Sequence, residues 1–264
     1  MSTDNVPPTQ EPRATIAEKR ARFRAMHEDS FFLLPNPWVV GSAKRLERLG
    51  FPALASTSSG LAWSLGLDDQ QVGLHQVLDH LTTLATATDL PLNADFEHGF
   101  ARASEAVATN VRLAAATGVA GLSIEDFRDG ALYDEELAAE RIRAARAALD
   151  EVDENIVLVG RCEILLMDPA AIDVAVNRLV AYAEAGADCL YAPGVSDPRH
   201  IARIVEAVAP KPVNVLSWGE SMRPKELAEL GVRRMSVGGK LARAAWEAFD
   251  VAARSLARTQ AAAG

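Results

Sequence analysis

The residues best suited to chemistry are three carboxylates near the middle of the chain. Asp95 and Glu97 lie two positions apart where an apolar segment ends, and Glu125 ends the next such segment. Residues two apart on a strand point the same way, so we expect these carboxylates to converge on one small volume. Converging carboxylates repel one another and need a proton or a hard cation to coexist. A single acid could equally be a helix cap or a solvated loop residue, whereas the group favours a functional site.

The chemistry of these side chains favours a hard metal ion. No histidine or cysteine is expected among the inward-facing strand-end residues, which argues against zinc. Oxygen ligands favour Mg²⁺ or Mn²⁺, with water and substrate completing the octahedron. His98, next to Glu97, and Tyr133 are candidates for an acid or base. A histidine in such a loop is also often simply exposed.

Arg161 follows the apolar segment 156–160. A guanidinium at such a position is unfavourable unless it pairs with an acid or with a substrate carboxylate. Two interpretations stay open, and both can hold together: an ion pair with Glu125 or Glu163, or a planar fork presented to a ligand. The Ser-Ser-Gly-Leu segment at 58–61 could also offer backbone N–H groups to an anion.

Eight apolar segments define the elements that must position these residues. Gly50, Gly118, Gly186 and Gly231 each close a helical pattern and precede a short apolar run, which is typical of a helix ending before a strand. The sequence predicts strands at 31–36, 52–57, 91–95, 121–125, 156–161, 188–192, 213–217 and 234–237. It predicts helices at 42–49, 74–88, 104–117, 135–149, 169–185, 198–208, 224–230 and 240–256. Eight such units predict an α/β fold, the (β/α)8 TIM barrel, with a doubly wound open sheet as the alternative.

In a TIM barrel the chemistry lies where strands end and the following loops begin. The predicted strand ends are polar here, whereas the opposite ends are mostly Pro, Gly, Val and Ala. This asymmetry predicts an active site on one face. A helical pattern at 15–27 predicts an extra helix covering the opposite face. We expect residues 1–14 to be a flexible tail and residues 15–264 to form a single barrel domain.

The overall composition excludes several classes of protein. The chain has 264 residues and a net charge of −9, which leaves no electrostatic footprint for nucleic acid or anionic lipid. No uncharged apolar stretch is long enough to span a bilayer, and the N-terminus lacks the apolar region of a secretory signal. Two cysteines, Cys162 and Cys189, are too few for a disulfide framework, so we expect a cytoplasmic protein.

Several motifs together resemble the isocitrate lyase / phosphoenolpyruvate mutase superfamily, over nearly the whole chain. They are Leu-Pro-Asn-Pro-Trp at 34–38, Thr-Ser-Ser-Gly-Leu at 57–61, Gly-Leu-Asp-Asp at 66–69, Asp-Phe-Glu-His-Gly-Phe at 95–100, Ile-Glu-Asp at 124–126 and Gly-Arg at 160–161. One substitution stands out, because Glu97 occupies the position of a second Asp in the superfamily's metal motif. The Asp-Phe-Glu-His-Gly-Phe and Ile-Glu-Asp motifs at this spacing are fairly specific for the superfamily.

The resemblance implies roles for these residues. Mg²⁺ would be bound directly by Asp95, with Asp69, Glu97 and Glu125 acting mostly through water. The substrate carboxylate would be held by four residues, Ser59, Gly60, Leu61 and Arg161.

Asn214, on the seventh predicted strand, is a further candidate for substrate binding, and the candidate catalytic residues are Arg161, Glu125 and His98. The implied substrate is a small 2-oxo or 2-hydroxy acid. The shared chemistry is the making or breaking of a C–C or P–C bond beside an enolate, which the metal stabilises as a Lewis acid.

The resemblance also implies a C-terminal helix swapped between subunits and a homotetramer built from such dimers. One departure concerns the lid. Isocitrate and methylisocitrate lyases carry a Lys-Lys/Arg-Cys-Gly-His motif after the strand 4 acid. Residues 126–133 contain no Cys, His or Lys, and they are too few for the long gating loop of the mutases.

We therefore expect an Mg²⁺-dependent lyase that cleaves a C–C bond of a small 2-oxo or 2-hydroxy acid. The alternative among enzymes is a phosphonopyruvate-type hydrolase or a phosphoenolpyruvate mutase acting on a P–C bond. The alternative from another class is a barrel that binds a carboxylate without turnover.

Overall fold

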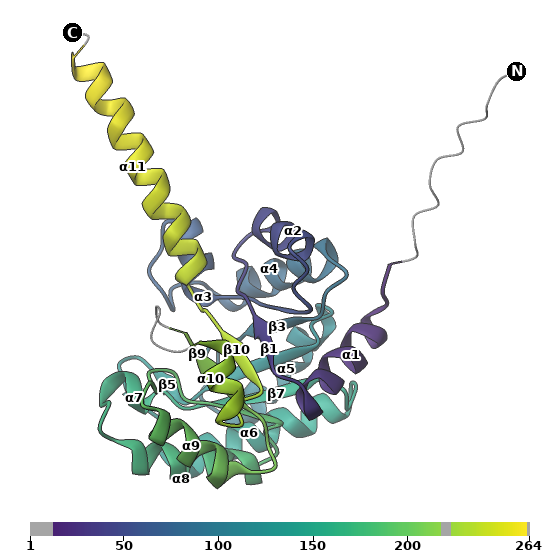
Figure 1. Ribbon diagram of the computed structural model, residues 1–264. Helices are drawn as coiled ribbons and strands as arrows, with labels where there is room; N and C mark the ends of the chain where they lie inside the picture. Colours follow the sequence, from purple (N-terminus) through teal and green to yellow (C-terminus); the bar gives the residue numbers. More distant parts are fainter. Residues whose placement is uncertain (1–12, 218–222, 263–264) are drawn as a thin grey trace, which may run out of the picture.

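The computed structural model describes residues 13–217 and 223–262 (Figure 1). Eight parallel strands form one sheet, in the order β1-β10-β9-β8-β7-β4-β3-β2. Their bounds are β1 Phe32–Leu34, β2 Leu54–Ala55, β3 Leu92–Asp95, β4 Gly121–Glu125, β7 Val157–Arg161, β8 Cys189–Tyr191, β9 Val213–Leu216 and β10 Arg234–Ser236. All eight predicted strands are confirmed, with slightly shorter bounds for most of them.

The two end strands of this sheet, β1 and β2, also meet. Ala55 donates a backbone hydrogen bond to the Pro35 carbonyl at 3.1 Å. Beside it, Asn36 Nδ2 donates to the Ser56 carbonyl at 2.8 Å. The strands therefore close into a (β/α)8 TIM barrel, and the open-sheet alternative is wrong.

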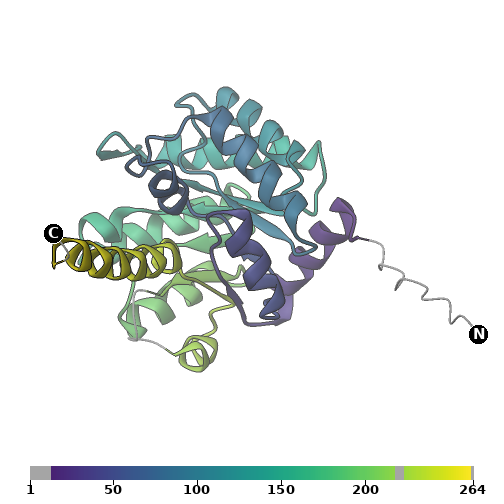
Figure 2. The ribbon, with the colours of Figure 1, turned by 90° about the horizontal axis from the view of Figure 1, so that it is seen from above.

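Helices lie around the strands, as the view from above shows (Figure 2). The helices are α1 Ile16–Asp29, α2 Val40–Arg48, α3 Ser58–Ser64, α4 Leu74–Ala87, α5 Ser104–Ala116, α6 Glu135–Asp150, α7 Ile164–Met167, α8 Ile172–Glu184, α9 Pro198–Val208, α10 Pro224–Glu229 and α11 Lys240–Ala262. The predicted helices are present, but α8 begins three residues later than expected. Two short helices, α3 and α7, and a hairpin of β5 Phe127–Arg128 with β6 Ala131–Leu132 were not predicted.

Two apolar cores hold the barrel together. The larger one lies between strands and helices; α5, for example, buries Val107 and Val111 at helical spacing. The smaller one fills the barrel interior and includes Phe32, Val157 and Tyr191. Burial of these side chains is the main favourable contribution to folding.

Helix α1 covers the face of the barrel where the strands begin, as predicted. Its Phe23 is fully buried in the interior core. Lys19 donates to the Ala85 and Thr88 carbonyls at the C-terminal end of α4, and Arg20 donates to the Ala115 carbonyl at the end of α5. Cations are favourable at such helix C-termini, so α1 is held over the barrel by both packing and charge.

The two chain ends differ from the barrel. Helix α11 extends away from the other elements (Figure 1), and its Trp246, Phe249, Val251 and Leu256 are exposed. Residues 1–12 of the expected tail lie outside the described residues, whereas Arg13 pairs with Asp89. Over the described ranges, no helix is long and apolar enough to cross a membrane. Helix exchange between subunits stays a prediction.

Candidate active site

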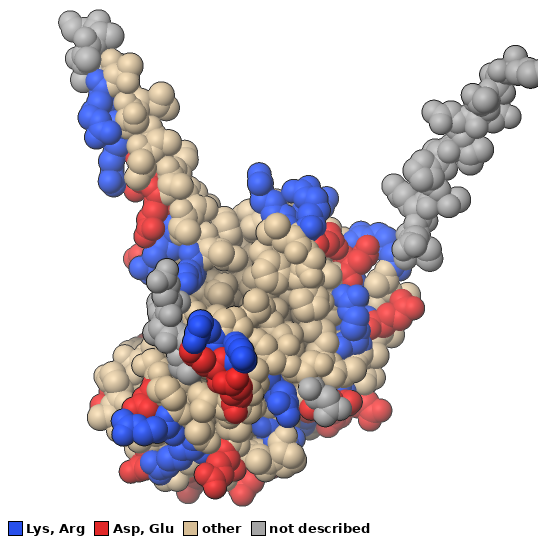
Figure 3. All heavy atoms as spheres, viewed as in Figure 1, with Lys and Arg blue, Asp and Glu red and all other residues tan. Residues whose placement is uncertain are grey.

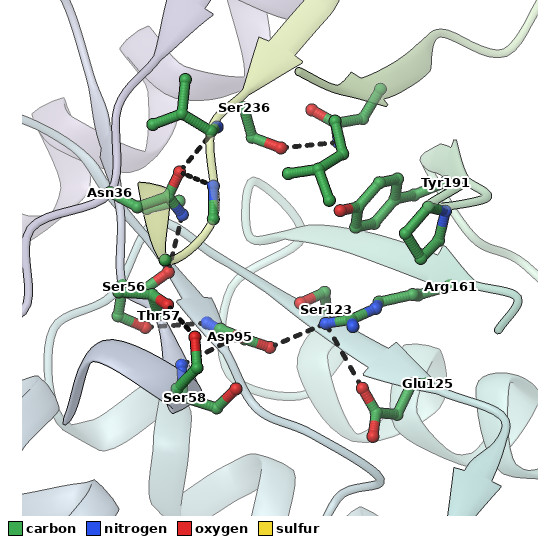
Figure 4. Close-up of a pocket in the computed structure, with 18 of the residues that line it drawn as sticks. Asn36, Ser56, Thr57, Ser58, Asp95, Ser123, Glu125, Arg161, Tyr191 and Ser236 are labelled. Atoms are coloured by element: carbon green, nitrogen blue, oxygen red, sulfur yellow. Dashed lines mark hydrogen bonds and ion pairs between the residues drawn. The ribbon is translucent and has the colours of Figure 1, made fainter. Parts of the chain in front are cut away.

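A cavity of about 220 Å³ opens at the carboxyl ends of the strands (Figure 4). Its lining includes six of the predicted site residues, namely Ser59, Asp69, Asp95, Glu125, Arg161 and Asn214. Three of these end strands: Asp95 ends β3, Glu125 ends β4 and Arg161 ends β7. The polar strand ends thus line one cavity at a single face of the barrel.

Arg161 joins the carboxylates at the centre of this site. Its Nη1 lies 3.2 Å from Asp95 Oδ1 and 3.3 Å from Glu125 Oε2. Its Nε and Nη2 donate to the two carboxylate oxygens of Glu163. Burial lowers the pKa of Arg161, but Glu163, Glu125 and Asp95 outweigh it and raise the pKa well above the usual value. Of the two interpretations left open, the ion pair is present, with both expected acids and with Asp95 as well.

Asp95 is held by the loop that follows β2. Its Oδ2 accepts a hydrogen bond from the backbone N–H of Ser58 at 2.9 Å, and its own N–H donates to Ser56 Oγ at 2.8 Å. Asp69 lines the same cavity, and burial, followed by the charge of Asp95, raises the pKa of Asp69. These two carboxylates are therefore crowded at one side of the cavity (Figure 4 shows Asp95).

Glu97, two residues after Asp95, does not line the cavity. It is buried, it has a positive φ of 45°, and its Oε2 has no hydrogen-bond partner. Burial, followed by the charges of Asp95 and Asp69, raises the pKa of Glu97 to about 8. A buried carboxylate oxygen without a partner is unfavourable, so this side chain is suited to hold a proton or to lie near a cation.

These observations fit a divalent cation with oxygen ligands. A cation beside Asp69 and Asp95 would offset the repulsion that raises the pKa of Asp69 and Glu97. Within the described ranges, no three His, Cys, Asp or Glu side chains are arranged to hold a metal ion by themselves. Mg²⁺ suits such a site, since it keeps several waters and uses only one or two carboxylates.

Glu125 has a partner that sequence reasoning missed. Gln70 Nε2 donates to Glu125 Oε1 at 3.0 Å, from a residue with a positive φ of 65°. Burial raises the pKa of Glu125 well above its usual value, although Arg161 opposes this. Gln70 directly follows the Gly-Leu-Asp-Asp motif. This position beside a motif is the one feature of the sequence that indicates a role for Gln70 in the site.

The Ser-Gly-Leu segment begins helix α3 instead of forming an open loop. Thr57 is the N-cap: its Oγ1 accepts from Gly60 N at 3.3 Å and its carbonyl accepts from Leu61 N at 3.1 Å. Ser59 lines the cavity, whereas Gly60 and Leu61 do not. The backbone N–H groups of Gly60 and Leu61 are thus used within the helix, which corrects the expectation that they face an anion.

Gly60 is required for a spatial reason. A Cβ at this position would lie 2.6 Å from Thr57 Cγ2 and 2.9 Å from Trp38 Cβ. The glycine of this motif therefore lets α3 pack closely.

The two candidate proton donors named from the sequence do not reach the cavity. His98 packs its ring against Phe100, and its Nδ1 is buried without a partner. Burial and the nearby Arg128 and Arg141 lower the pKa of His98 to about 4. Tyr133 is buried, its hydroxyl has no partner, and its ring lies 3.9 Å from the Arg141 guanidinium. The structure therefore does not support a catalytic role for His98.

The floor of the cavity is formed by polar residues on inner strand positions. Arg234 Nε donates to Asn214 Oδ1 at 2.9 Å, and Asn214 Nδ2 donates to Ser236 Oγ at 3.0 Å. Asn36 Oδ1 accepts from the backbone N–H groups of Val237 and Gly238. Asn214 thus lines the cavity as predicted, but its amide oxygen already has a partner.

The fold and the position of this cavity define a TIM-barrel enzyme. Residues 23–257 match the phosphoenolpyruvate phosphomutase family. The chain belongs to this family, so the resemblance to the isocitrate lyase / phosphoenolpyruvate mutase superfamily is confirmed, and with it the assignment to its lyases and mutases.

Three similar proteins illustrate this relationship. The chain is 32% identical to an uncharacterized protein of Mycobacterium tuberculosis, over 80% of this chain and 79% of that protein. It is 30% identical to an oxaloacetate decarboxylase of Pseudomonas aeruginosa, over 84% and 79%. A solved structure from Burkholderia cenocepacia J2315, assigned to the lyases or mutases, has 43% identity and a TM-score of 0.89, over 92% and 90%.

Proposed function

We propose that this enzyme decarboxylates a small 2-oxo acid that carries a carboxylate on C3, with oxaloacetate as the simplest member of that class. The reaction breaks a C–C bond next to an enolate, as expected from the motifs. The oxaloacetate decarboxylase relative supports this choice of substrate class.

One observation carries the choice of reaction. Of the described residues that line the cavity, none is Lys, His or Cys, and Asp95, Glu125 and Glu163 are each paired with Arg161. A retro-aldol cleavage of a 2-hydroxy acid starts with removal of a hydroxyl proton by a base. Decarboxylation of a 3-carboxy-2-oxo acid needs no base, because the departing carboxylate supplies the electron pair. The cavity is therefore better suited to decarboxylation.

The side chains of the site would have distinct tasks. Asp95 and Asp69 would hold Mg²⁺ or Mn²⁺, with Glu97 and Glu125 acting through water. When bound, the metal supplies Lewis-acid stabilisation of the oxygen on C2. Arg161 and Ser59 would hold the C1 carboxylate, and Glu163 and Gln70 would keep Arg161 and Glu125 in position.

The segment after β4 is too short for the long gating loop of the mutases, which favours a C–C reaction. It forms the β5–β6 hairpin, Phe127–Arg128 with Ala131–Leu132, and Phe127 contributes to the cavity lining. No lysine, histidine or cysteine lies in this hairpin. The experiment below also tests the two alternatives, a P–C bond-cleaving enzyme and a barrel that binds a carboxylate without turnover.

The decisive experiment follows CO₂ and pyruvate release from oxaloacetate with Mg²⁺, after subtraction of the metal-catalysed rate without protein. We expect turnover that EDTA abolishes and that an Asp95→Ala variant lacks. Phosphonopyruvate is the comparison substrate, and release of phosphate or phosphoenolpyruvate from it would favour the P–C reaction. Binding of oxalate without turnover of either substrate would favour a carboxylate-binding barrel.

We further propose that α11 packs on a second subunit and that such dimers form a tetramer. Phe249 and Leu256 are 61% and 73% exposed, and the barrel surface beside the base of α11 is largely uncharged (Figure 3). Light scattering at micromolar concentration tests this, because a monomer would contradict it.

The two buried free thiols, Cys162 and Cys189, support a cytoplasmic location.

A further inference from the structure

Tyr191, which sequence reasoning did not single out, ends β8 and turns its side chain into the barrel. It is 8% exposed and contributes to the cavity lining. Figure 4 shows its hydroxyl directed into the open part of the cavity. The Arg161 guanidinium carbon lies 5.4 Å from the centre of the Tyr191 ring. The phenol therefore reaches the space beside the residue that we expect to hold the substrate carboxylate.

The hydrogen bonds behind Tyr191 have a defined direction. An arginine side chain can only donate, so Asn214 must turn its amide oxygen toward Arg234 Nε. Asn214 Nδ2 then donates to Ser236 Oγ, which leaves the Ser236 proton for another acceptor. Burial raises the pKa of Tyr191 above its usual value, and the neighbouring Arg161 cation opposes this. The Tyr191 hydroxyl itself faces the cavity, so its proton is available to a bound group.

Three carboxylates of the lining are already engaged with one partner. Asp95, Glu125 and Glu163 each pair with the Arg161 guanidinium. The remaining hydroxyl groups belong to serine and threonine, which are much weaker acids than a phenol. Among the described lining residues, Tyr191 is the acidic side chain that is neither paired with Arg161 nor expected to hold the metal.

We propose that Tyr191 is the catalytic acid that delivers a proton to the enolate carbon; this rests on the proposed function. As the C–C bond breaks, CO₂ leaves and the electron pair stays on the pyruvate fragment as an enolate. The enolate carbon takes the proton from Tyr191 Oη, a C–H bond forms, and the C2 carbonyl is restored. The phenolate left on Tyr191, favoured by the neighbouring Arg161 cation, takes a proton from solvent water. Each turnover consumes one proton from solvent.

The test removes one oxygen atom with Tyr191→Phe and uses three measurements. The first is oxaloacetate decarboxylation. The second is exchange of the methyl hydrogens of pyruvate with D₂O in the presence of Mg²⁺, measured by NMR. This exchange begins with the reverse of the protonation step. The third is binding of oxalate, which has the charge and shape of the pyruvate enolate. The matched control is Tyr133→Phe, which removes a phenol oxygen outside the cavity.

We expect Tyr191→Phe to slow decarboxylation and methyl exchange by about 10²- to 10⁴-fold, as for other general acids. Oxalate affinity should stay within about threefold, and Tyr133→Phe should match the wild type. Wild-type rates in Tyr191→Phe would overturn this assignment alone. Loss of oxalate binding would overturn it as well, because Tyr191 would then be a binding residue. A wild-type protein that neither decarboxylates nor exchanges would overturn it together with the proposed function.

Discussion

Arg234 Nη1 lies 3.3 Å from His27 Nε2 across the floor of the barrel. His27 Nδ1 lies 2.7 Å from the Phe23 carbonyl, so Nδ1 carries the proton and Nε2 accepts from the guanidinium. Burial and then the charge of Arg234 lower the pKa of His27 to about 3. Helix α1, on the far side of the barrel, thereby fixes the arginine that holds Asn214, and Asn214 in turn donates to Ser236.

His27 makes stability depend on pH on the acid side. Its pKa is about 3 in the folded chain and 6.5 ordinarily, so the unfolded chain binds the extra proton between these values. The free energy of unfolding therefore falls as the pH drops from 6.5, by up to about 1.4 kcal/mol per pH unit from this group. Urea unfolding of the wild type and of His27→Gln between pH 7 and 4 checks this. Parallel curves would show that His27 does not titrate as described.

Glu97 has the opposite effect in metal-free protein. Its pKa is about 8 in the folded chain and 4.5 ordinarily, so the native state holds a proton that the unfolded chain has lost. Stability in EDTA should therefore fall as the pH rises from 4.5 to 8, by up to about 1.4 kcal/mol per pH unit. Glu97→Gln should flatten this slope and raise the melting temperature at pH 8. Thermal unfolding with EDTA gives both results, and a slope equal to that of the wild type would contradict them.

Asp95→Ala should abolish binding of Mg²⁺ and Mn²⁺ and reduce activity to background. The fold should survive, because Arg161 keeps Glu125 and Glu163 as partners. Titration calorimetry with Mn²⁺ measures the binding, and circular dichroism checks the fold. Unchanged affinity for Mn²⁺ would place the metal site elsewhere.

Arg161→Lys should impair catalysis even though the charge is kept. The guanidinium contacts Asp95, Glu125 and Glu163 through three nitrogens, which one ammonium cannot replace. Loss of a charge-assisted hydrogen bond of about 1.5–3 kcal/mol corresponds to roughly ten- to a hundredfold in kcat/KM. The control is Arg112→Lys, which changes an exposed ion pair with Glu151. Near wild-type kcat/KM in Arg161→Lys would limit Arg161 to a structural role.

The strands and the acidic cluster could be predicted from the sequence because their signals are local. Apolar runs after glycine mark the strands, and Asp95, Glu125 and Arg161 stand at the ends of such runs. Tyr191 carried no comparable signal, since a tyrosine in an apolar strand is equally consistent with a core residue.

Other features depend on contacts between distant parts of the chain. Gln70 reaches Glu125 across 55 positions, and Arg234 meets His27 across 207. The N-terminal cap on Gly60 was missed because Ser-Ser-Gly is typical of loops, while Thr57 before it supplies the capping oxygen. Spacing along the chain cannot reveal the Gln70–Glu125 and Arg234–His27 pairs, because only the folded barrel brings them together.

The junction between β1 and β2 differs from the other edges of the barrel. A proline carbonyl, Pro35, and the carboxamide of Asn36 hold it, whereas the neighbouring strands share ladders of two to five residue pairs. We therefore expect local opening of the barrel to begin at the β1–β2 junction. The Ala55 amide hydrogen should exchange with solvent faster than the amide hydrogens inside β4. Asn36 also ties the loop after β10, so each opening of the junction would loosen one wall of the cavity. The cavity proposed to bind substrate thus lies beside the junction of the barrel that we expect to open most readily.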